Sequence, residues 1–122
     1  MNQKNIFSGI SFVLVVQGLL FFFMGGKLAA DAFPALAPEC QQAVHSVIEV
    51  LGMLSILVGL VAYSNRNSPQ VLWAFTVGFI LVAGITLKHM FVDHINVPVF
   101  AAVIQTLIAL LCAYLWMQSN KN

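Results

Sequence analysis

The sequence has very little charge. Only 7% of its 122 residues are Asp, Glu, Lys or Arg, and the formal net charge is +1. It contains no basic run, no glycine-rich phosphate loop and no Walker pattern, so nothing supports binding to nucleic acid or to a nucleotide. Strict alternation of apolar and polar residues is also absent, which argues against a membrane β-barrel.

Cysteine is scarce as well. Cys40 and Cys112 are the two cysteines, and no CxxC motif occurs. In the helices expected below, one lies near the start of its helix and the other about 15 residues into its helix, at different depths. A disulfide needs α-carbons within about 7 Å. The sequence therefore argues against an internal disulfide and against thiol–disulfide exchange.

Apolar residues dominate what is present. They make up 61% of the chain, and the mean hydropathy is +0.95. A helical membrane crossing needs roughly 20 mostly apolar residues, and four stretches meet this length: about 6–24, 41–63, 70–90 and 97–117. We expect a single membrane domain, 1–122, that is all-α: an integral membrane bundle of four transmembrane helices. The first stretch is longer than the apolar region of a signal peptide.

The few charges indicate an orientation. Four crossings place both termini and the central loop on one side, with Lys4, Arg66 and Lys121 and no acidic residue. The other side carries Lys27 and Lys88 together with all four acidic residues. Cytoplasmic loops carry an excess of Lys and Arg, so we expect both termini in the cytoplasm.

Ionisable residues gather at the non-cytoplasmic end. Nine of the twelve Asp, Glu, Lys, Arg and His residues lie there: Lys27, Asp31, Glu39, His45, Glu49, Lys88, His89, Asp93 and His94. Glu49 lies about ten residues into its helix, and a charge at the bilayer centre costs about 2.5–3.5 kcal/mol. We expect Glu49 to be neutral, paired or facing a wet cavity.

Two His–carboxylate pairs stand out at this end. His45 and Glu49 are four residues apart, as are His89 and Asp93, which places each pair on one face of its helix. Such pairs serve as metal ligands, proton relays or hydrogen-bonding groups for a polar ligand. We expect Lys27, His45, Glu49 and His89 to bind a ligand in one polar cap, with His89 facing Glu49. The alternative metal set is His45, Glu49, His89 and Asp93. The simplest alternative is that these histidines only hydrogen-bond to neighbouring loops.

Small and polar residues inside the apolar stretches indicate helix packing. Close helix approach is expected at five glycines: Gly18, Gly25, Gly26, Gly52 and Gly59. Interhelical hydrogen bonds account for Gln17 and Gln105. These seven positions are therefore interpreted as packing positions.

Three segments together resemble the DoxX-like family of small four-helix membrane proteins. They are GLLFFFMGGKLAADAF, with a first helix that ends at glycines before Lys27; EVLGMLSILVGL, with Glu49 followed by two glycines; and KHMFVDHINVP, with His89 close to the end of helix three. The resemblance covers nearly the whole chain. It implies a four-helix fold in the bacterial inner (plasma) membrane, and some family members are associated with thiosulfate:quinone oxidoreduction or redox-stress complexes. By this analogy Lys27, Glu49 and His89 are the positions of interest.

Three functions remain open on the sequence. The first is an accessory or subunit of a membrane redox system that holds a quinone-like molecule or a lipid headgroup at the non-cytoplasmic end. The second is a structural or assembly subunit that docks another membrane protein or a second copy of itself. The third is a metal- or haem-binding four-helix module, with His45 and His89 as axial ligands in the haem case. The residues do not decide whether the protein is an enzyme.

Overall fold

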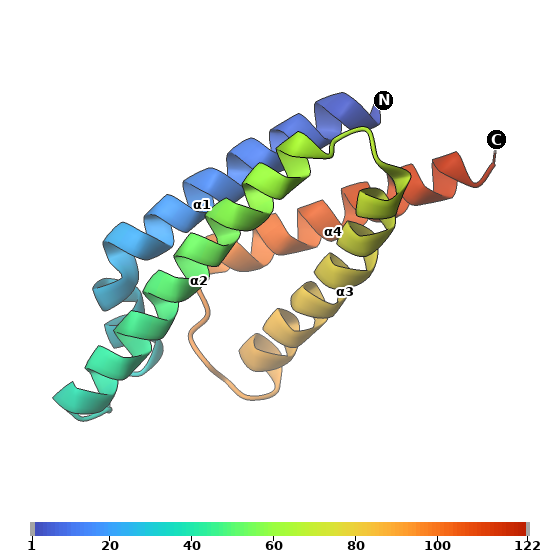
Figure 1. The fold of residues 1–122 in the computed structure, drawn as a ribbon. Helices are drawn as coiled ribbons and strands as arrows, with labels where there is room; N and C mark the ends of the chain where they lie inside the picture. The colour runs from blue at the N-terminus through green and yellow to red at the C-terminus, as the bar shows by residue number, and fades with distance from the viewer. Residues whose placement is uncertain (1, 122) are drawn as a thin grey trace.

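The chain folds into two antiparallel helical hairpins. The computed structural model describes residues 2–121, and its helices are α1 (Gln3–Ala32), α2 (Pro38–Ser64), α3 (Pro69–Phe91) and α4 (Val99–Ser119). α1 packs along α2 and α3 packs along α4, whereas the hairpins contact each other much less, mainly through α1 and α4 (Figure 1). The described residues thus confirm the all-α architecture of four helices, each of which is long and apolar enough to cross a membrane.

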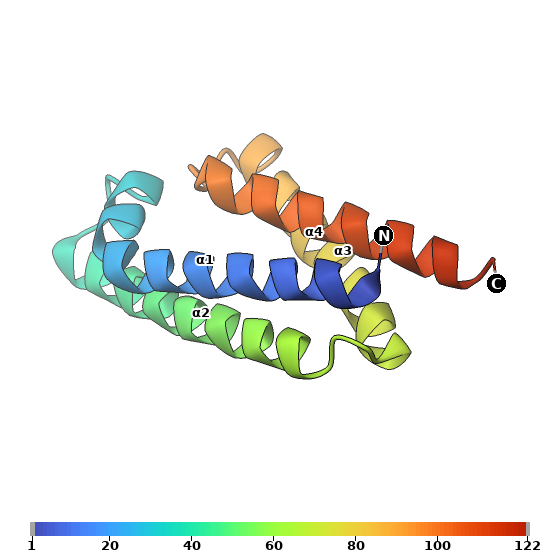
Figure 2. The ribbon, with the colours of Figure 1, turned by 90° about the horizontal axis from the view of Figure 1, so that it is seen from above.

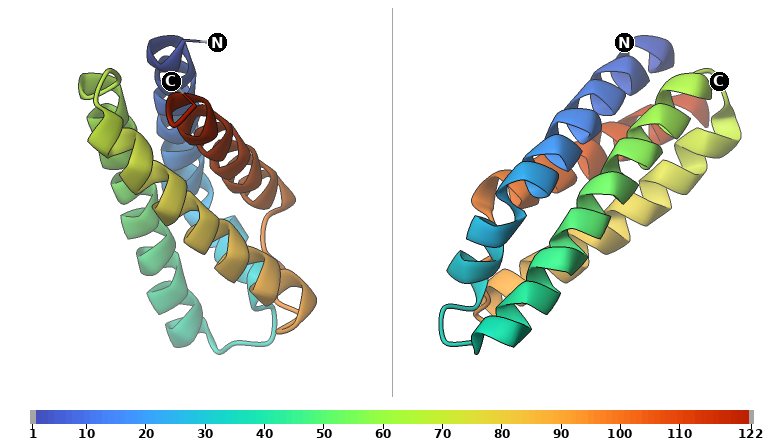
Figure 3. Two further views of the ribbon diagram at one scale, coloured as in Figure 1. Left: turned by 90° about the vertical axis from the view of Figure 1, so that its right-hand side faces the viewer. Right: turned by 60° about the vertical axis from the view of Figure 1, so that its left-hand side comes forward.

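The bundle has two different ends. Both termini and the α2–α3 loop lie at one end, here called the terminal end (Figures 1 and 3). The α1–α2 loop, 33–37, and the α3–α4 loop, 92–98, lie at the opposite end, here called the polar end. The helices alternate in direction, as serial crossing predicts.

The first helix is longer than expected. We expected it to end near residue 24, before the two glycines, but α1 continues to Ala32. Glycine lowers helix stability without terminating a helix by itself, and the alanines that follow are strong helix formers. The helix ends because Pro34 disfavours helical geometry at Phe33. The remaining helix bounds lie within three residues of the predicted ones.

Glycines set the distance between α1 and α2. A Cβ atom added to Gly52 would lie 2.6 Å from the carbonyl oxygen of Gly18, and one added to Gly59 would lie 3.0 Å from that of Ser11. Between these contacts Ser55 Oγ donates a hydrogen bond of 2.9 Å to the carbonyl oxygen of Leu14. The two backbones are therefore in direct contact, which confirms the interpretation of these glycines as packing positions.

The two hairpins are joined by an apolar core at the terminal end. Its buried residues come from all four helices: Phe7, Ile10, Leu14, Ala62, Leu72, Phe75, Ile108, Cys112 and Leu115. Phe7 of α1 and Phe75 of α3 have ring centroids 5.3 Å apart. The ribbons of the two hairpins diverge from this core toward the polar end (Figure 2). Both cysteines are free; Cys112 is buried in the core and Cys40 is exposed.

The α1–α2 contact gives a direct test. We expect Gly52→Ala to destabilise the protein by about 1–3 kcal/mol, because the added methyl group forces the two backbones apart. Unfolding of the purified protein in mixed micelles measures this change. Gly78→Ala in α3 is the matched control, since a Cβ there meets nothing within 4 Å, and it should be neutral or stabilising. Equal stability of the two variants would contradict the packing role.

Candidate functional site

The pair on α2 lies against α1. His45 Nε2 and Glu49 Oε1 are 3.1 Å apart. The imidazole ring rests on two glycines, and a Cβ added to Gly25 would lie 2.9 Å from His45 Cδ2. The glycines that we expected to end the first helix instead make room for this ring. The contact between the two side chains shows that Glu49 is paired, as expected, although both remain partly exposed, at 35% for His45 and 41% for Glu49.

The pair on α3 depends on how that helix ends. His89 Nδ1 lies 2.7 Å from Asp93 Oδ2, and Lys88 Nζ lies 3.3 Å from the same oxygen. Four-residue spacing is kept beyond the last helical residue because the amides of Val92 and Asp93 both donate to the carbonyl oxygen of Lys88. This wider turn still leaves the Asp93 carboxylate beside the His89 ring.

Hydrogen bonds hold the α3–α4 loop to both α3 and α1. His94 adopts a left-handed conformation with φ of 53°, which histidine tolerates better than most residues. The reversal lets the Ile95 amide donate to the carbonyl oxygen of His89 at 2.9 Å. Asn96 Nδ2 donates to the carbonyl oxygen of Asp31 at the end of α1, at 3.2 Å. The loop thus connects His89 to the first hairpin.

The charge state of Asp93 orients His89. The pKa of Asp93 lies below its usual value, first because of the hydrogen bond from His89 and then because of Lys88. An ionised carboxylate only accepts hydrogen bonds, so Nδ1 of His89 carries the hydrogen. In the neutral imidazole Nε2 is then an acceptor. Nε2 of His89 is therefore available to accept a hydrogen bond from a ligand, while Asp93 holds the ring through Nδ1.

A cavity lies between the hairpins at the polar end, next to His89. It has a volume of about 220 Å³, and we call it the hairpin cavity. Its lining comes from all four helices and the α3–α4 loop: Phe21, Leu28, Ala32, Ile48, Leu51, Thr86, His89, Ile95, Asn96, Val97, Pro98, Ala101 and Gln105. The cavity is mostly apolar, with four polar side chains, a composition typical of small-molecule sites.

The polar groups of the hairpin cavity retain unused hydrogen-bonding capacity. Thr86 Oγ1 donates to Gln105 Oε1 at 2.6 Å, which leaves the amide nitrogen of Gln105 as a donor. Asn96 uses its nitrogen on Asp31, so its Oδ1 stays an acceptor. Together with His89 these groups offer a ligand both donors and acceptors.

The structure divides the expected polar cap. His89 lines the hairpin cavity, but the α2 side chains that reach it are Ile48 and Leu51. His45 instead lines a separate groove of about 380 Å³ beside Gly26 and Gln41, with Glu49 paired to it. The expectation that His89 faces Glu49 in one cap is corrected, because the face of α2 that carries the His45–Glu49 pair packs on α1.

Lys27 lies neither at the hairpin cavity nor at the groove beside His45. With Asp31 and Asn96 it lines a cavity of about 280 Å³, here called the Lys27 cavity. This cavity adjoins the hairpin cavity, since both include Leu28, Asn96, Val97 and Pro98. Lys27 is therefore a neighbour of the His89 site.

The expected metal ligands are not gathered. Within residues 2–121 no group of three or more His, Cys, Asp or Glu side chains is placed to hold a metal ion. His45 with Glu49 and His89 with Asp93 form two separate pairs. His45 and His89, the expected axial pair for a haem, line different cavities.

Three polar residues that line the hairpin cavity were not predicted from the sequence to bind a ligand. Gln105 was assigned to interhelical hydrogen bonding, which its bond with Thr86 confirms, while Thr86 and Asn96 were not singled out. The available signal was spacing, because Thr86 and His89 are three residues apart and share a helix face. Gln17 differs from expectation: it is 5% exposed, and its Oε1 has no partner among the described residues.

The Asp93 contact generates a pH prediction. We expect His89→Ala to raise the pKa of Asp93 toward the ordinary value of about 3.9, since it removes the largest stabilising contact of the carboxylate. Carbon-13 NMR of the carboxyl group measures this, with Asp31→Asn used for assignment. The contact stabilises the fold above about pH 4, and its contribution is lost as the pH falls through the lowered pKa. An unchanged Asp93 pKa in His89→Ala would contradict the assigned hydrogen bond.

Comparison of the chain with protein-family models, curated protein sequences and solved structures finds no match. The resemblance to DoxX-like proteins therefore stays a prediction.

Proposed function

We propose that the protein binds the head of a small quinone-like molecule in the hairpin cavity and serves as an accessory or subunit of a membrane redox system. The observation that carries this proposal is the His89–Asp93 contact of 2.7 Å at the wall of a mostly apolar cavity. A quinone ring is flat, with apolar faces and two carbonyl oxygens that project from its edge. Apolar walls with a few placed hydrogen-bonding groups match that pattern.

Cavity size narrows the choice of ligand. The volume of about 220 Å³ lies below the roughly 300–1,000 Å³ usual for drug-sized ligands. One or two fused rings agree with this volume better than a haem, which is much larger. A haem-binding role is therefore supported less well than a quinone-like ligand.

Gln105 and His89 are the two side chains that bind the ligand oxygens in the proposal. The amide nitrogen of Gln105 donates to one carbonyl oxygen of the ligand. His89 donates through Nε2 to the other when protonated, and accepts from a quinol hydroxyl there when neutral. Asp93 keeps the imidazole in the required orientation and stabilises its charge. Lys27, in the adjoining cavity, adds a positive charge beside the hairpin cavity.

The proposed orientation in the membrane follows from how Lys and Arg are distributed between the two ends of the bundle. We place the protein in a bacterial inner membrane with both termini in the cytoplasm, because Lys4, Arg66 and Lys121 lie at the terminal end and Lys27 and Lys88 at the other. The hairpin cavity then opens near the non-cytoplasmic surface. The electron-transfer partner would be another membrane protein, with membrane lipid around both.

Ligand binding to His89 variants tests this function. We expect His89→Ala and Gln105→Leu each to raise the Kd for tetramethyl-1,4-benzoquinone about tenfold, which corresponds to one lost hydrogen bond of about 1.4 kcal/mol. Equilibrium dialysis of the purified protein in nanodiscs measures the Kd. Glu49→Gln is the matched control, since Glu49 lies outside the cavity lining, and it should leave the Kd within twofold. No binding to the unmodified protein, or equal binding by all variants, would refute the proposal.

A further inference from the structure

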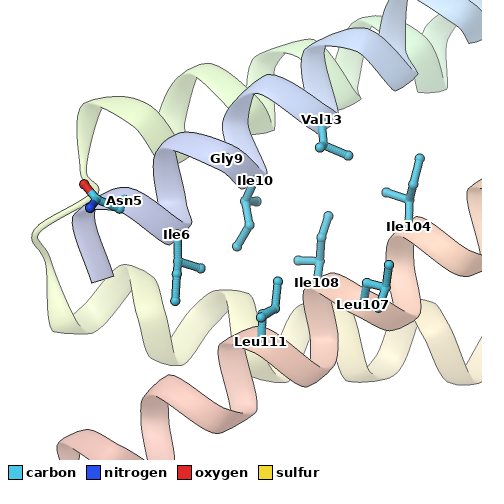
Figure 4. A pocket seen from close by; sticks show the side chains of 9 residues that line it. All are labelled: Asn5, Ile6, Gly9, Ile10, Val13, Ile104, Leu107, Ile108 and Leu111. Atoms are coloured by element: carbon cyan, nitrogen blue, oxygen red, sulfur yellow. The ribbon is translucent and has the colours of Figure 1, made fainter. Parts of the chain in front are cut away.

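Another hollow lies between α1 and α4 on the terminal side of the bundle. This α1–α4 groove has a volume of about 340 Å³. Side chains of α1 and α4 point toward each other across it (Figure 4). Apart from Asn5, its lining is apolar: Ile6, Gly9, Ile10, Val13, Ile104, Leu107, Ile108 and Leu111. A Cβ added to Gly9 would meet nothing within 4 Å, so the groove has unfilled space beside α1.

The groove and the Lys27 cavity lie along one flank of α1. Both cavities are bounded on the other side by α4 or by the loop that leads into it. Six residues of α1 follow this flank from one cavity to the other. At 3.6 residues per turn, their directions around the helix axis differ by no more than about 60°. The six residues are Ile6, Gly9, Val13, Leu20, Met24 and Lys27. The seam between α1 and α4 is thus apolar at its terminal end and polar beside the hairpin cavity.

Distance along this seam limits what could occupy it. Gly9 in the groove and Phe21 in the hairpin cavity are twelve residues apart, which is about 18 Å along the helix axis. Half of the hydrocarbon core is about 15 Å thick. A chain that only reaches Val13, eight residues from Phe21, needs about 12 Å, whereas a chain that fills the groove as far as Gly9 is longer than one leaflet.

We infer that the α1–α4 groove holds the long hydrocarbon chain of the molecule whose head occupies the hairpin cavity. The inference rests on the proposed function and deepens it: the ligand is an amphiphile with a small carbonyl-bearing ring and one chain longer than a leaflet, as in polyisoprenoid quinones. A short-chain molecule would fill the head site and leave the groove to membrane lipid.

Photo-crosslinking locates the end of the chain. The probe is a trimethyl-1,4-benzoquinone with a long saturated chain that ends in a diazirine, added to the purified protein in nanodiscs. After irradiation, mass spectrometry should find the adducts within 5–13 and 104–111, and excess probe without the diazirine should suppress them. Adducts spread over the lipid-facing sides of α2 and α3 would overturn the inference.

Filling the groove gives an independent measurement. Gly9→Leu should raise the Kd of the long-chain quinone about tenfold, equivalent to roughly two methylene groups that can no longer be buried. The Kd of tetramethyl-1,4-benzoquinone should stay within twofold. Gly84→Leu in α3 is the matched control, because its Cβ also meets nothing within 4 Å, and it should affect neither ligand.

The outcomes separate the two proposals. If the short-chain quinone fails to bind the unmodified protein, the proposed function fails and the inference fails with it. If both quinones bind and Gly9→Leu weakens neither, the head site stands and the groove is overturned as the chain site. Selective weakening of the long-chain ligand by Gly9→Leu, with unchanged binding in Gly84→Leu, supports both.

Discussion

Direct backbone contact between α1 and α2 is the constraint on which the rest of the structure depends. Gly18 and Gly52 have no side chains, so a carbonyl oxygen of each helix lies where the other residue would carry a Cβ. α2 therefore packs on α1 through the face that carries its glycines, and few residues of α2 are buried. With α2 held in this way, the second hairpin packs mainly against α1 through α4.

Unequal packing along the bundle creates the hairpin cavity. Aromatic and branched side chains, among them Phe7 and Phe75, join the hairpins at the terminal end. At the polar end smaller groups such as Ala32 and Ala101 face the interior, and the hairpin cavity lies between them. The hairpin cavity is thus a consequence of where the large core side chains are placed.

A set of hydrogen bonds at the polar end holds His89 and the loop that follows it in place. Asp93 orients the imidazole, the amides of Val92 and Asp93 extend the helical spacing, and Asn96 fastens the loop to α1. These bonds fix the position of the ring without using its second nitrogen. The same loop therefore both closes the bundle and presents a titratable group to the cavity.

Periodicity, apolar length and spacing within each helix determined the four helices, their alternating direction and the two His–carboxylate pairs, because all of these are local properties of the chain. Which face of each helix meets which neighbour was decided only by the tertiary structure. His45 and Glu49 turn toward α1 because the glycines there allow close approach, while Ile48 and Leu51 are left to face His89. Packing brings three segments to the hairpin cavity, and these carry Thr86, Asn96 and Gln105. The sequence pattern of a single helix cannot predict contacts between separate segments.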